Sequence, residues 1–136
     1  MAGKVYSMAG VFLLLTTVAN PLLANTLTIR CERNSLFLGD IPNAQMAEGG
    51  LPTSSEFLIN NDKFMTDSFG PILDVNTGNV RVRGNRYELR FSFMYQSNIF
   101  DYTMEYNSNS GSYQQTIYSR YHNLAVGGAQ GDCRQI

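Results

Sequence analysis

Residues 79–106 consist of three runs in which apolar and polar side chains alternate, joined by the two-residue sequences Gly84-Asn85 and Gln96-Ser97. Alternation with a period of two is typical of a strand that buries one of its faces. When the runs are paired as hairpins about these two turns, apolar residues meet apolar residues across both pairs of strands. A slip of one residue would move every side chain to the wrong face. The segment therefore predicts a three-stranded antiparallel meander.

This register divides the meander into two faces of different character. One face is apolar and aromatic, and we expect it to form the core, although a ligand-lined barrel interior is an alternative. The other face is polar and carries four arginines together with three carboxylates. The aromatic residues of the first face are Tyr87, Phe91, Phe93, Phe100, Tyr102 and Tyr106, and the charged residues of the second are Arg81, Arg83, Arg86, Arg90, Glu88, Asp101 and Glu105.

Further strands are predicted on both sides of the meander. The glycine-containing stretches VNTGN (75–79), NSNSGS (107–112) and GGAQG (127–131) are interpreted as turns, and one helical turn is expected at Asn43–Ala47. The predicted fold class is all-β, a single small antiparallel meander barrel or sandwich of about 7–9 short strands. The additional strands are TLTIRCE (26–32), EFLIN (56–60), KFM (63–65), PILDV (71–75), YQQTIYSRY (113–121) and a last strand that carries Cys133.

The N-terminal 24 residues have the features of a secretory signal peptide. Lys4 is followed by an apolar run from about Met8 to Ala19 and by the small residue Ala24. The run is shorter than the roughly 20 residues that span a bilayer, and a buried core helix is the alternative. We expect cleavage after Ala24, leaving residues 25–136 as a single β domain without a transmembrane segment. The product would be secreted or periplasmic, and the lack of an Asn-x-Ser/Thr sequon favours a bacterial source.

The two cysteines, Cys31 and Cys133, lie near opposite ends of the predicted domain. In an oxidising compartment such a pair predicts a disulfide, with two free or intermolecular thiols as the alternative. A bond that closes a loop of about 100 residues would contribute roughly 4–5 kcal/mol on the chain-entropy model. It would also place the first and last strands side by side.

The composition offers little that resembles an enzyme. Without residues 1–24 the chain keeps nine basic and eleven acidic residues, so nucleic acid is not an expected partner. The single histidine, His122, is interpreted as an ordinary residue at a strand end. Asp101 and Glu105 would lie roughly 13 Å apart along one strand, whereas glycosidase carboxylate pairs are about 5–9.5 Å apart. No nucleophile elbow, zinc-binding helix or phosphate loop is found, so we expect no catalysis, metal or cofactor.

The predicted binding residues are Arg81, Arg83, Arg86 and Arg90. Arginine captures carboxylate and phosphate groups with two parallel hydrogen bonds, so a protein or an anionic glycan could dock on their face. The alternative is a solvated face that the neighbouring carboxylates neutralise. We predict an exported binding module, inhibitor-like in that it acts on another macromolecule. A surface component that assembles through strand edges and a small-ligand-binding barrel are the alternatives, and the sequence determines neither the partner nor the oligomeric state.

Overall fold

The computed structural model describes residues 26–41, 44–69 and 77–136. Each strand in these residues pairs antiparallel with the next along the chain, and β8 pairs with β1, so the strands close into a barrel. The predicted fold class is confirmed, and the architecture is a barrel and not a sandwich. The elements are β1 (Thr26–Leu38), α2 (Ala44–Gly50), β2 (Ser54–Asn60), β3 (Lys63–Thr66), β4 (Thr77–Arg83), β5 (Arg86–Tyr95), β6 (Asn98–Asn107), β7 (Ser112–Ser119) and β8 (Leu124–Gln135).

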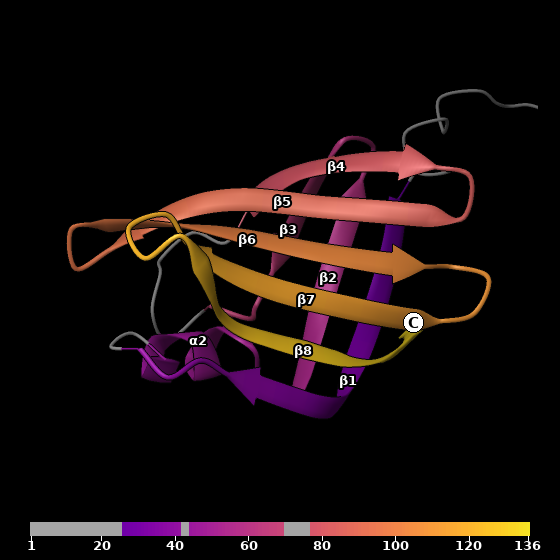
Figure 1. Ribbon diagram of the computed structural model, residues 1–136. Helices are drawn as coiled ribbons and strands as arrows, with labels where there is room; N and C mark the ends of the chain where they lie inside the picture. The colour runs from indigo at the N-terminus through magenta and orange to yellow at the C-terminus, as the bar shows by residue number, and fades with distance from the viewer. Residues whose placement is uncertain (1–25, 42–43, 70–76) are drawn as a thin grey trace, which may run out of the picture.

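Strands β4–β8 lie side by side across the front of the view in Figure 1, and β2, β3 and the first part of β1 cross behind them at a steep angle. β1 contains an irregularity between Arg33 and Ser35, where its register against β8 shifts. Before this point β1 pairs with β2 as well as with β8, and beyond it β1 pairs with β8 alone. The first strand was predicted to end at Glu32, and the bulge lets it continue to Leu38.

The predicted register of the meander is confirmed. Arg83 pairs with Arg86 across the first turn, and Tyr95 pairs with Asn98 across the second. Gly84 has a φ of +59°, the left-handed conformation that a tight hairpin turn requires and that glycine adopts without steric cost. The local alternation of residue types and the turn chemistry therefore specify the same pairing.

The barrel interior is filled by apolar and aromatic side chains. Phe69, which follows β3, is fully buried, and its ring centroid lies 5.4 Å from that of Phe91, 5.0 Å from that of Phe93 and 5.3 Å from that of Tyr102. A Cβ atom on Gly50 of α2 would lie 2.1 Å from Cε1 of Phe69, so the helix packs directly on this ring. The aromatic face of the meander is thus part of the core, as expected for an eight-stranded barrel with a packed interior.

Two of the glycine-rich stretches predicted as turns contribute residues to strands: residues 127–131 lie in β8 and residues 77–79 lie in β4. Gly131 lies within β8, where a Cβ atom would be 2.0 Å from the carbonyl oxygen of Glu32 and 2.7 Å from Cε1 of Tyr113. Gly78 lies within β4, where a Cβ atom would be 2.3 Å from a carbonyl oxygen of β5. These glycines allow close packing and do not reverse the chain. The third prediction was correct, because Gly111 lies between β6 and β7 with a φ of +82°.

Several other predictions can be placed on the structure. The expected helical turn is α2, which extends to Gly50. β7 ends at Ser119, so Tyr121, which was predicted to lie in this strand, is part of the following turn with 75% of its surface exposed. The signal peptide at 1–24, the strand at 71–75 and residue Asn43 lie outside the described residues.

The turn between β5 and β6 holds two residues with a backbone that suits glycine. Gln96 and Ser97 have φ values of 50° and 67°, and glycine is favoured at the second position of such a turn. We expect Ser97→Gly to raise the free energy of unfolding by about 0.5–1 kcal/mol, since relief of left-handed strain outweighs the added chain entropy. Urea denaturation measures the change. Ser54→Gly, at an exposed strand position, should lower stability instead, and equal effects of the two changes would contradict this assignment.

Candidate functional site

The four predicted arginines lie together on the outer face of the β4–β5 hairpin. Arg81 pairs with Glu88 in the register, Arg83 with Arg86, and Arg90 with Asn79. All four arginines are exposed, because their positions alternate with the residues that point into the barrel. The hairpin thus groups them on one surface, as the sequence predicted.

Ion pairs engage two of these arginines. Nη2 of Arg86 lies 2.8 Å from Oε1 of Glu105, and Nε of Arg81 lies 4.0 Å from Oε1 of Glu88. Within residues 26–41, 44–69 and 77–136, Arg83 and Arg90 form no ion pair. Exposed pairs of this kind contribute only about 0–1 kcal/mol to stability. The guanidinium groups of Arg83 and Arg90, which take part in none of these pairs among the described residues, are available to a partner.

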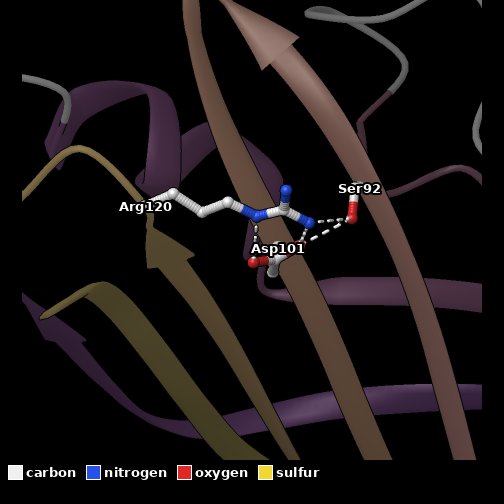
Figure 2. Close-up of polar contacts among 3 residues, drawn as sticks. All are labelled: Ser92, Asp101 and Arg120. Carbon is white, nitrogen blue, oxygen red and sulfur yellow. Dashed lines mark hydrogen bonds and ion pairs between the residues drawn. The ribbon is translucent and has the colours of Figure 1, made fainter. Parts of the chain in front are cut away.

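A fifth arginine on this face, Arg120, was not identified from the sequence. It follows β7, and its Nε and Nη2 donate to the two carboxylate oxygens of Asp101 at 2.9 and 2.8 Å, as Figure 2 shows. The hydroxyl of Ser92 donates to Oδ1 of Asp101 at 2.6 Å. The backbone N–H of Arg120 donates to the carbonyl of Ile99 at 3.1 Å, which fixes the residue beside β6. Only the β6–β7 register could have revealed this pair, and the sequence left that register open.

The Arg120 guanidinium holds the pKa of Asp101 below its ordinary value, and the Ser92 hydrogen bond and the charge of Arg90 act in the same direction, while partial burial opposes them. A lowered pKa means that the ionised carboxylate stabilises the fold above the ordinary pKa, and that this contribution is lost as the pH falls through the folded-state value.

We therefore expect Arg120→Gln to raise the pKa of Asp101 toward the ordinary value of about 3.9 and to reduce the loss of stability on acidification. NMR titration of the Asp101 carboxyl carbon measures the pKa directly. Arg134→Gln, at an exposed position of β8, is the matched control and should leave the pKa unchanged. An Asp101 pKa that is the same in both variants would show that Arg120 is not its main partner.

The outer face of β4–β7 is hollowed beside this network. One recess of about 740 Å³ lies over the middle of the four strands, and a second of about 280 Å³ lies over the β4–β5 turn region. The larger recess follows a register row with two short threonine side chains, and the smaller one is bordered by three of the predicted arginines. The row consists of Asn79, Arg90, Thr103 and Thr116, and the three arginines are Arg81, Arg83 and Arg86.

Other polar side chains form hydrogen bonds with one another. Inside the barrel Nε2 of Gln115 donates to the hydroxyl of Tyr102 at 2.6 Å, and burial raises the pKa of Tyr102, so its phenol stays neutral. His122 is half-buried, with Nδ1 3.2 Å from the hydroxyl of Ser119. Among the described residues no three His, Cys, Asp or Glu side chains gather closely enough to hold a metal ion.

No protein-family model, curated protein or solved structure matches the chain. In the part of the chain that the structure describes, no helix has the length and hydropathy needed to cross a membrane. The function is therefore inferred from the geometry of the barrel and its outer face.

Proposed function

We propose that this protein is an exported, non-enzymatic binding module that contacts an anionic macromolecule through the outer face of β4–β7. The observation that carries this proposal is the charge arrangement on that face, where five arginines accompany three carboxylates. Each carboxylate has its own arginine partner, and within the residues that the structure describes Arg83 and Arg90 form no ion pair. A local positive excess on a chain of net charge −1 favours capture and orientation of a negatively charged partner.

Other features support this function over its alternatives. The packed aromatic interior around Phe69 supports a role for the outer surface in preference to an interior ligand. Assembly through strand edges needs unpaired strands, and the closed ring leaves only short stretches of the described strands, such as Ser35–Leu38 of β1, paired on one side alone, which favours a binding role instead. The Cys31–Cys133 disulfide is compatible with export, because such bonds persist in oxidising compartments.

A capture experiment tests the proposal. Protein lacking residues 1–24 is immobilised, material from the envelope and medium of the producing cell is passed over it, and the retained partner is quantified. We expect Arg83→Glu and Arg90→Glu each to lower the captured amount, and higher salt to lower it further. Arg134→Glu makes the same charge change on β8 and should have no effect. Equal capture by all three variants would rule out the outer face of β4–β7 as the binding surface.

A further inference from the structure

A third recess extends the recess of about 740 Å³ across the outer face of the barrel. It has a volume of about 320 Å³ and is bordered by Thr116, Gly128 and Phe37, which are register partners on β7, β8 and β1. Thr116 lines both recesses. Together they form a trough, by which we mean the row Arg90–Thr103–Thr116–Gly128–Phe37 and the side chains on either side of it. The trough crosses four strand spacings, or about 19 Å.

The end of the trough on β5 carries the guanidinium of Arg90, which forms no ion pair with any residue that the structure describes. Asp101 beside the trough is bound by Arg120, and Glu105 is bound by Arg86. Arg90 is exposed and has no ion pair among the described residues. An exposed guanidinium is well suited to a two-bond contact with a carboxylate. The neighbouring acidic groups are already neutralised, so they do not oppose an incoming anion.

The other lining groups are suited to a ligand rich in hydroxyl groups. Between its two ends the trough presents short hydroxyl and amide side chains, which donate and accept hydrogen bonds. At the far end Phe37 is 56% exposed, and its register partner Gly128 has no side chain that could cover the ring. The C–H face of a sugar ring can bury apolar surface against such an aromatic ring. The polar lining groups are Asn79, Ser92, Thr103, Thr116, Gln114 and Gln130.

We infer that the trough binds an acidic polysaccharide, with a uronic-acid carboxylate on Arg90 and a sugar ring against Phe37. This inference rests on the proposed function and names its ligand class. An acidic protein fits less well, because protein hot spots are aromatic and arginine anchors near the centre of an interface, whereas the centre of the trough is formed by Thr103, Thr116 and Gly128. Nucleic acid would need several phosphate contacts, and Arg90 is the trough's one unpaired cation among the described residues.

Isothermal titration calorimetry with a short oligogalacturonate tests this inference. We expect the wild type to bind the acid form, and to bind the fully methyl-esterified form at least about tenfold more weakly, because esterification removes the carboxylates. Arg90→Gln and Phe37→Ala should each weaken binding about tenfold. Arg134→Gln is the matched control, since Arg134 is an exposed arginine of β8 that lies outside the trough and outside the binding face. Circular dichroism confirms that each variant is folded.

The possible outcomes separate this inference from the function on which it rests. Equal weakening by Arg90→Gln and Arg134→Gln would mean that diffuse charge holds the ligand, and would overturn the trough. Full binding by folded Phe37→Ala would overturn it as well. If polyglutamate binds and oligogalacturonate does not, while capture of the natural partner still depends on Arg83 and Arg90, the ligand class is wrong and the binding face stands. If neither probe binds and capture is independent of both arginines, the proposed function fails too.

Discussion

Replacing both Cys31 and Cys133 with alanine should lower the free energy of unfolding by about 4–5 kcal/mol. The disulfide joins residues that face each other in the register of β1 and β8, the strands that close the barrel. Its sequence separation of 102 residues spans almost the whole described chain, so the bond restricts the unfolded ensemble strongly. Because small domains are stable by only about 5–15 kcal/mol, the loss would be a large share of the total.

Urea denaturation of the oxidised wild type and of the double alanine variant measures this loss. Reduction of the wild type with dithiothreitol is an independent way to remove the bond and should give a similar decrease. Alanine is the better replacement at Cys31, which is fully buried, because serine would bury a hydroxyl group. If the denaturation midpoint changed neither in the variant nor on reduction, the disulfide would not be what stabilises the barrel.

Phe69→Ala should lower the free energy of unfolding by about 3–5 kcal/mol. The ring is fully buried and contacts three aromatic rings of β5 and β6. The helix α2 packs on it at Gly50, so truncation would leave a cavity between the helix and the sheet. The cavity adds to the lost burial of apolar surface, and both terms favour unfolding.

Phe37→Ala is the matched control, because it makes the same chemical change at an exposed position. We expect it to change the free energy of unfolding by less than about 0.5 kcal/mol. The comparison uses equilibrium urea denaturation of both variants under the same conditions. If the two variants lost the same stability, Phe69 would not be the centre of the core.

The sequence predicts the central hairpins well because their information is local. Each pair in β4–β6 follows from alternation and from the two turns, and any slip exposes the apolar face. The predicted cluster of arginines on one face follows from the same register. The Cys31–Cys133 disulfide was predicted from a different kind of evidence, the number and positions of the cysteines, and the structure confirms it.

The rest of the fold depends on contacts that no local pattern shows. The sequence around Gly131 is typical of a turn. Its place in β8 is explained only by the close approach of the Tyr113 side chain and the Glu32 backbone, which leave no room for a Cβ atom. In β7 the buried polar residues Gln115 and Ser119 interrupt the apolar alternation, so the register with β6 was not predicted. The Arg120–Asp101 pair of the candidate site was missed for the same reason.

The claim that the outer face and not the barrel interior holds the partner is tested most directly by NMR. Side-chain Nε–Hε signals of Arg83 and Arg90 report the outer face, and methyl signals of Leu89 and Met104 report the interior, where both residues are fully buried. During titration with the captured partner we predict that both arginine signals shift in proportion to occupancy while the two methyl signals stay in place. Shifts of the Leu89 and Met104 methyl signals with unchanged arginine signals would contradict the account.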